Sequence, residues 1–152
     1  MKNIQKAIHI IGIDIRTTND NGRSFQDIPP LWERFMKEGY AEKIPNKLDN
    51  DIYAVYTNFE NEGKNNQGMY SLIIGCNVAP ETKLPNNFKK IIIPPGNYRV
   101  FPVEKGRPDK VGETWQSIWA IPENEKHAWS FKCEFECYRA SNEIDIFIGL
   151  KN

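Results

Sequence analysis

The sequence predicts an α+β fold in which duplicated strand-helix-strand-strand units form an antiparallel sheet with two main helices and a central pocket. Two observations lead to this prediction. Apolar, β-branched stretches alternate with polar turns, and the same order of strand, helix, strand and strand occurs in both halves. At 152 residues the chain has the size of one ordinary domain. We therefore expect a single domain over residues 1–152, with one repeat over about residues 4–79 and a second over about residues 88–152.

The first half begins with a strand and continues with a helix. Residues 4–15 are rich in isoleucine, which predicts a mostly buried strand, and residues 17–27 are expected to form a polar loop. A helix should begin at Pro29 and Pro30 and end at Gly39, since proline favours the first helical turn and glycine the end. The apolar stripe of this helix consists of Leu31, Trp32, Phe35 and Met36.

Two strands complete the first half, at residues 52–59 and 69–78, with a polar turn between them. A proline-rich linker at residues 80–87 leads to the second half. There the segment after the next pair of prolines predicts a strand, mainly over residues 97–103.

The second helix carries Trp115, Ile118 and Trp119 on one stripe and should end before the next proline. The last two strands are expected at residues 131–138 and 143–150, as a hairpin-like pair. Because the two halves are equivalent, we expect a cleft between them. Clefts of this kind are frequent ligand sites.

The composition argues against several classes of protein. The 20 Lys and Arg residues balance the 20 Asp and Glu residues, so net charge gives no reason to expect nucleic acid or an anionic membrane as partner. The first residues resemble neither a signal peptide nor a membrane span. The three cysteines are an odd number and are expected to be reduced thiols, which favours a cytoplasmic location.

No metal or cofactor is expected. His9 and His127 are the only histidines and stand apart from each other. Cys133 and Cys137 would lie roughly 13 Å apart along a strand at ~3.3 Å per residue, too far for a shared metal or a disulfide. The sequence also contains no phosphate-binding glycine loop and no nucleophile elbow.

Seven segments, in order along nearly the whole chain, carry a family resemblance. They are residues 30–35 (Pro-Leu-Trp-Glu-Arg-Phe), 52–56, 70–75, 93–101, 115–119, 135–138 (Phe-Glu-Cys-Tyr) and 144–148. Together they resemble the GyrI-like small-molecule-binding family. The resemblance implies the duplicated fold with a central ligand pocket found in the effector-binding halves of AraC-type and MerR-type multidrug regulators, which bind lipophilic cations. We expect a stand-alone effector-binding domain without a helix-turn-helix, and hence no direct DNA binding.

The resemblance also implies that a glutamate of the Phe-Glu-x-Tyr stretch lies at the pocket floor, a position that Glu136 matches. Strand alternation points the same way. It predicts one face with Phe131, Cys133, Phe135 and Cys137, and another with Lys132, Glu134, Glu136 and Tyr138. A carboxylate among aromatic rings is desolvated, which raises its pKa, and a bound cation offsets that cost.

Aromatic residues make up 12% of the chain and include four tryptophans, enough to line a cavity as well as fill a core. The candidate ligand-binding residues are Glu136, Trp32, Tyr70, Trp115, Trp119, Tyr138 and Phe101. Cation–π attraction to such rings is worth roughly 0.5 to 2 kcal/mol each. The plainer interpretation is that these rings are ordinary core and that the glutamate lies on a solvated outer face.

Three functions follow from these observations. The leading hypothesis is a binding protein that sequesters or senses an amphipathic cationic drug-like molecule. A hydrolase that detoxifies electrophilic small molecules with the same glutamate is the second, because a carboxylate in a dry pocket suits either role. The third is a gyrase-interacting protein, which the family name implies, and for which only the polar segments at residues 17–27 and 61–67 offer contact surfaces.

Overall fold

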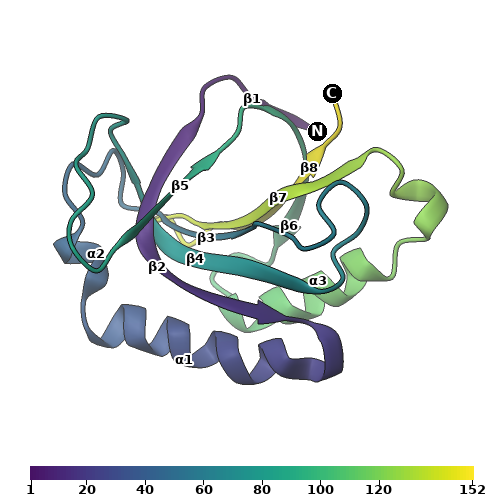
Figure 1. Ribbon diagram of the computed structural model, residues 1–152, viewed down its shortest axis with the longest axis horizontal. Helices are drawn as coiled ribbons and strands as arrows, with labels where there is room; N and C mark the ends of the chain where they lie inside the picture. The colour runs from purple at the N-terminus through teal and green to yellow at the C-terminus, as the bar shows by residue number, and fades with distance from the viewer.

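The computed structural model describes all 152 residues as one curled, antiparallel, eight-stranded sheet with its helices gathered on one side (Figure 1). The strands are β1 (Lys2–Ile4), β2 (Ile8–Thr18), β3 (Ile52–Thr57), β4 (Met69–Val78), β5 (Lys89–Ile93), β6 (Gly96–Val103), β7 (Trp129–Tyr138) and β8 (Ile144–Leu150). The helices are α1 (Arg23–Lys37), α2 (Tyr40–Lys43) and α3 (Val111–Trp119), with short 3-10 turns η1 (Asp20–Gly22), η2 (Pro108–Lys110) and η3 (Glu123–Glu125).

The strand order is symmetric about the centre of the sheet. It runs β1-β6-β8-β7-β3-β4-β2-β5, so the strands β6, β8 and β7 of one half mirror β2, β4 and β3 of the other. The halves join where β3 pairs antiparallel with β7, with Ala54 opposite Glu136 and Tyr56 opposite Glu134. The predicted α+β fold with an antiparallel sheet and two main helices is confirmed.

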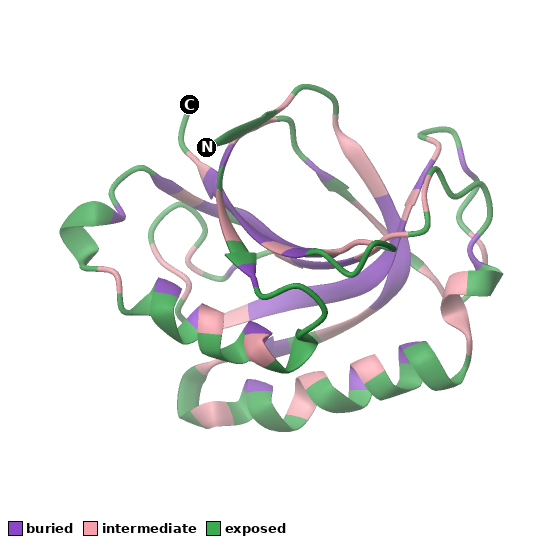
Figure 2. Cartoon of the chain, turned by 180° about the vertical axis from the view of Figure 1, so that it is seen from behind, coloured by how far each residue is buried: buried purple, intermediate pink, exposed green.

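Three clusters of buried side chains stabilise this arrangement. One packs α1 on the sheet through Leu31 and Phe35, and a second packs α3 on it through Trp115 and Ile118. A third, which includes Phe135, covers the opposite face of the sheet. Figure 2 shows the helices with exposed outer surfaces and buried residues toward the sheet, the pattern of amphipathic helices.

The start of the first helix was predicted wrongly. Helix α1 begins at Arg23, so residues 23–27 are helical rather than part of a loop, and Pro29 and Pro30 lie inside the helix. Proline disfavours the helix interior only through a local steric cost and one lost hydrogen bond. Here Asp27 accepts a hydrogen bond from Thr17 outside the helix (2.8 Å) and pairs with Arg23 one helical turn earlier (3.1 Å), and both contacts support the first turns.

The alternation predicted for β7 fails at its beginning. Phe131 has a backbone φ of +50°, and the pairing register with β8 shifts between Trp129 and Glu134. This bulge turns Phe131 to the α3 side, where it packs with Trp129 instead of sharing a face with Cys133. From Glu134 onward the predicted alternation holds.

Candidate ligand-binding site

A cavity of about 330 Å³ lies between α1, α3 and the face of the sheet that they cover. It is placed where the α1 cluster and the α3 cluster meet, because Tyr56 and Tyr138 pack against both. Its lining comes from Asn19, Ser24, Phe25, Ile28, Pro29, Trp32, Tyr56, Phe59, Asn66, Tyr70, Pro108, Val111, Gly112, Trp115, Trp119, Glu134, Glu136 and Tyr138. Volumes of about 300–1,000 Å³ are typical of small-molecule sites.

Glu136 is the most deeply placed charged group of this cavity, with 2% of its surface exposed. Its Oε2 accepts hydrogen bonds from the hydroxyl of Tyr56 and from the indole Nε1 of Trp115, both at 2.7 Å. Its Oε1 accepts one from the hydroxyl of Tyr138. Burial raises the pKa of Glu136, and these three donors oppose that increase because they stabilise the ionised form.

The donors are themselves affected by the carboxylate. Burial first, and then the neighbouring Glu136, raise the pKa of Tyr56 and of Tyr138 well above the usual tyrosine value, so both hydroxyls stay protonated. Tyr70, also at the cavity, has its pKa raised to about 12, mainly by burial. The site therefore holds three hydrogen-bond donors around one buried carboxyl group.

Aromatic rings form a connected wall around this charge. Trp32 meets Tyr138 edge-on at 5.0 Å between ring centroids, and Tyr56 meets Trp115 edge-on at 5.3 Å. Tyr56 also lies 5.7 Å from Tyr70. Edge-to-face contacts at these distances rigidify the rings and leave other ring faces free for a guest.

Most of the residues predicted for the site meet at this cavity. Those that line it are Glu136, Trp32, Tyr70, Trp115, Trp119 and Tyr138. Phe101 does not: it lies on β6, packs at the edge of the α3 cluster, and has the guanidinium of Arg99 over its ring at 4.7 Å. Strand β8 separates β6 from β7, which keeps Phe101 away from the glutamate.

Among the polar residues of the cavity that were not predicted as site residues are Tyr56 and Glu134. Tyr56 belongs to β3, and its bond to Glu136 joins residues 80 apart in sequence, so no local pattern reveals it. Glu134 carried a signal, because strand alternation already placed it on the face of Glu136. It is 4% exposed, and burial raises its pKa to about 7 despite the opposing charge of Lys126.

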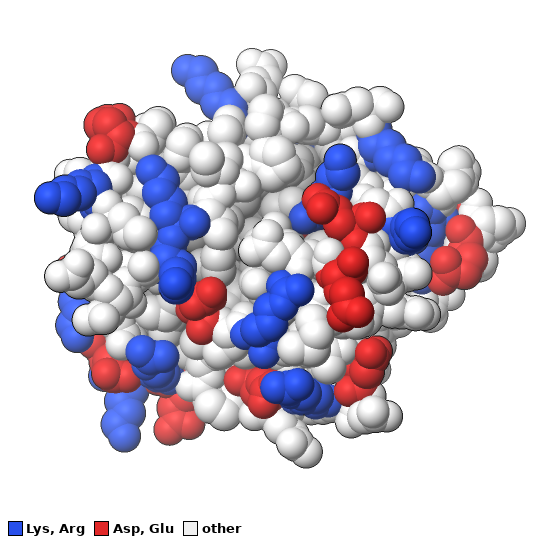
Figure 3. Space-filling view, in the orientation of Figure 1, with Lys and Arg blue, Asp and Glu red and all other residues white.

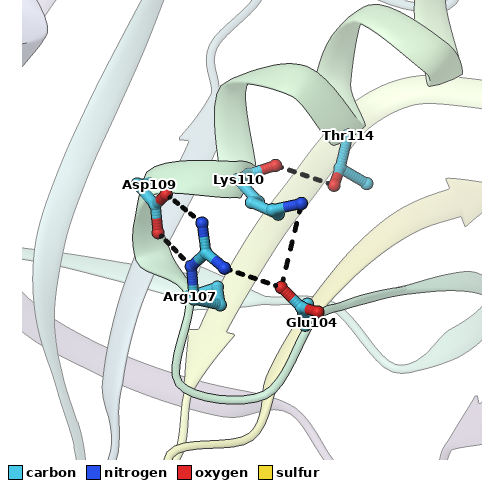
Figure 4. Close-up of polar contacts among 5 residues, drawn as sticks. All are labelled: Glu104, Arg107, Asp109, Lys110 and Thr114. Atoms are coloured by element: carbon cyan, nitrogen blue, oxygen red, sulfur yellow. Dashed lines mark hydrogen bonds and ion pairs between the residues drawn. The ribbon is translucent and has the colours of Figure 1, made fainter.

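A cluster of charged residues fixes the segment that enters α3 beside the cavity. Figure 4 shows Arg107 between Glu104 (3.2 Å) and Asp109 (2.8 Å), with Lys110 near Glu104 at 3.8 Å. Within this segment Thr114 donates a hydrogen bond to the carbonyl of Lys110 at 2.9 Å. These contacts hold η2 and the first turn of α3, which supply part of the cavity lining, against the end of β6.

Elsewhere on the molecule the charges are mixed. Lys and Arg are interspersed with Asp and Glu on the face drawn in Figure 3. None of the helices is long and apolar enough to cross a membrane. No group of three or more His, Cys, Asp or Glu side chains is arranged to hold a metal ion.

Residues 5–150 match a protein family, Cass2, described as integron-associated effector binding protein. The chain belongs to this family. Cass2 membership confirms the GyrI-like resemblance and the broad function class, binding of a small-molecule effector. No curated protein sequence matches the chain.

Solved structures agree with this assignment. The Cass2 chain is 26% identical to the integron cassette protein VCH_CASS2 from the mobile metagenome of Vibrio cholerae, with a TM-score of 0.74 over 99% of this chain and 94% of that one. The structure of SAV2435 bound to tetraphenylphosphonium has 16% identity and a TM-score of 0.78, over 100% and 95% of the two chains. A putative transcription regulation protein from Staphylococcus aureus MU50 has 17% identity and a TM-score of 0.74, over 99% and 96%.

Proposed function

We propose that this Cass2 protein binds an amphipathic cationic small molecule in the cavity between α1 and α3, with Glu136 as the counter-charge. The observation that carries the proposal is a carboxylate with 2% of its surface exposed, held at the floor of an aromatic cavity by three hydrogen-bond donors. Three donors keep a negative charge in a place where water does not solvate it well. A cation that enters the cavity then gains Coulomb attraction that is screened far less than in water.

The rings supply the second part of the recognition. Trp32, Trp115 and Trp119 offer apolar surface to the body of a lipophilic ligand. The π faces of the same rings attract its positive charge. Neither interaction requires a fixed hydrogen-bond geometry from the ligand. A site of this kind is expected to accept several lipophilic cations of suitable size.

A solved structure with the same fold supports a positive charge on the proposed ligand. SAV2435 was obtained with tetraphenylphosphonium, a lipophilic monocation, and it shares the fold of this chain over its full length. The hydrolase alternative would need Glu136 to activate water. Binding is favoured over it because three side-chain donors already use most of the acceptor capacity of this carboxylate.

Titration of intrinsic tryptophan fluorescence tests the proposal, since three tryptophans line the cavity. Tetraphenylphosphonium should quench saturably with one site per chain, whereas neutral triphenylphosphine oxide should bind much more weakly. Glu136→Gln should weaken the cation by about tenfold or more, because one partner of a buried charge pair is removed. Glu33→Gln, on the exposed side of α1, is the matched control and should bind like the wild type. Equal affinity for the two probes, or no effect of Glu136→Gln, would contradict the proposal.

A further inference from the structure

The cavity contains a second carboxylate whose situation differs from that of Glu136. Glu134 lies two residues earlier on β7, lines the same cavity and is 4% exposed. No side chain or backbone group of the protein donates a hydrogen bond to it, and it belongs to no ion pair. Its oxygens are not enclosed by protein atoms but border the cavity, so a ligand that fills the cavity meets an acceptor that no protein group has taken.

The protein groups that face Glu134 do not donate a hydrogen bond to its carboxylate. On β3 its neighbour across the sheet is Tyr56, whose hydroxyl donates to Glu136. On β4 the hydroxyl of Tyr70 donates to Asn19 at 2.7 Å. On β8 the neighbour is the apolar Ile148.

The nearest cation is also engaged elsewhere. Lys126 lies close enough to lower the pKa of Glu134, but its ammonium donates to the carbonyl of Trp119 at 2.9 Å and pairs with Glu123 at 3.6 Å. It also lies over the ring of Trp129 at 5.4 Å. Lys126 therefore lowers the pKa of Glu134 to some extent but forms no ion pair with it.

We propose that Glu134 determines which cations the cavity prefers, by accepting a hydrogen bond from an N–H group of the ligand. This inference rests on the proposed function and adds the chemical class of the ligand: a protonated primary or secondary amine, an amidinium or a guanidinium on an aromatic body. Glu136, which already accepts three hydrogen bonds from side chains, attracts any cation mainly through its charge. Glu134 distinguishes N–H cations from quaternary ammonium or phosphonium ions, which have no donor.

The geometry allows both carboxylates to act on one ligand. Residues two apart on a strand point to the same face and lie roughly 6.5 Å apart at ~3.3 Å per residue. A charged head at Glu134 can therefore keep the aromatic body against the rings around Glu136. Burial raises the pKa of Glu134 to about 7, so an incoming cation displaces a proton from part of the population near neutral pH.

The test compares two probes with the same aromatic body and the same single charge, of which only the first has N–H donors: protonated 9-(aminomethyl)anthracene and its bulkier N,N,N-trimethyl derivative. At about pH 8, where Glu134 is ionised, the wild type should bind the amine more tightly than the quaternary ion. Glu134→Gln should weaken the amine by about tenfold or more and the quaternary probe clearly less, since both lose Coulomb attraction but only the amine also loses a charge-assisted hydrogen bond. Glu136→Gln should weaken both probes.

Calorimetry in two buffers of different ionisation enthalpy gives an independent readout. Binding of the amine at about pH 7 should release more protons from the wild type than from Glu134→Gln. Thermal unfolding of the variant checks that it folds. If both probes bind but their affinity ratio survives Glu134→Gln, this inference is wrong while the proposed function stands. If neither probe binds the wild type, both fail.

Discussion

Glu134 and Glu136 occupy the same face of one strand, yet their surroundings give them different properties. Glu136 has three donors and Glu134 has none, although both are almost fully buried. Burial raises the pKa of each, and only for Glu136 do hydrogen bonds oppose it. At this scale, sequence alternation predicted the direction of both side chains. It could not predict the donors Tyr56 and Trp115, which come from 80 and 21 residues away.

Glu134 should make the stability of the protein depend on pH. A carboxyl whose pKa rises from 4.5 to about 7 on folding costs nothing below pH 4.5, and its cost grows until the pH passes about 7. Glu134→Gln removes that cost. The variant should match the wild type near pH 4.5 and exceed its free energy of unfolding by on the order of 3 kcal/mol near pH 8.

Urea unfolding across this pH range checks the prediction. Glu33→Gln, exposed on α1, should show no such trend. A stability difference between Glu134→Gln and the wild type that stays constant with pH would show that Glu134 is not titrating as described.

Tyr56→Phe should destabilise the protein in a pH-dependent way. The substitution removes a hydroxyl that donates to Glu136 at 2.7 Å, so the ionised carboxylate loses one of three donors. The expected cost is about 1–3 kcal/mol where Glu136 is ionised, and it should shrink as the pH falls and this group is protonated. Tyr98→Phe is the matched control, because its hydroxyl donates to the carbonyl of Pro94 on another part of the fold. The two variants should therefore differ in pH dependence when unfolding is followed by urea, and parallel profiles would contradict the role given to Tyr56.

At the scale of elements, the sequence predicted the strands better than the helix boundary. Strand β4 has the predicted bounds, Met69–Val78, because a continuous apolar stretch between polar turns is typical of a buried central strand. Helix α1 begins earlier than predicted, since Asp27 accepts a hydrogen bond from Thr17 of β2, a contact that no helix signal records, and forms an i,i+4 pair with Arg23. The bulge near Phe131 had no sequence signal, because positive φ is rare for a bulky residue.

The pairing of β2 with β4 depends on two glycines that face each other. Gly12 lies opposite Gly75, and a Cβ added at Gly12 would come within 2.0 Å of the Ile74 carbonyl oxygen. Backbone atoms cannot yield as a flexible side chain can, so Gly12→Ala should cost about 3 kcal/mol or more or prevent folding. Gly112→Ala in α3 meets nothing within 4 Å and should instead stabilise the protein, by up to about 1 kcal/mol.

Thermal unfolding of the two variants checks these opposite effects. Wild-type stability for Gly12→Ala would mean that β2 and β4 do not approach each other as closely as the structure indicates.

At the scale of the whole molecule, the cavity follows from the duplication. Each half buries its own helix in its own cluster, and the two clusters meet at Tyr56 and Tyr138 without filling the space between α1 and α3. The repeat pattern of the sequence predicted a cleft between the halves. It could not predict that Phe101 stays outside the cavity, because the strand order β6-β8-β7 depends on pairing between distant segments.

The most direct test of this account is a crystal structure of the protein with tetraphenylphosphonium. We expect the phosphonium between α1 and α3, in contact with Trp32 or Trp115 and facing the Glu136 carboxylate across the cavity. A cation bound on the opposite face of the sheet, or a cavity closed by its own side chains in the complex, would contradict the account.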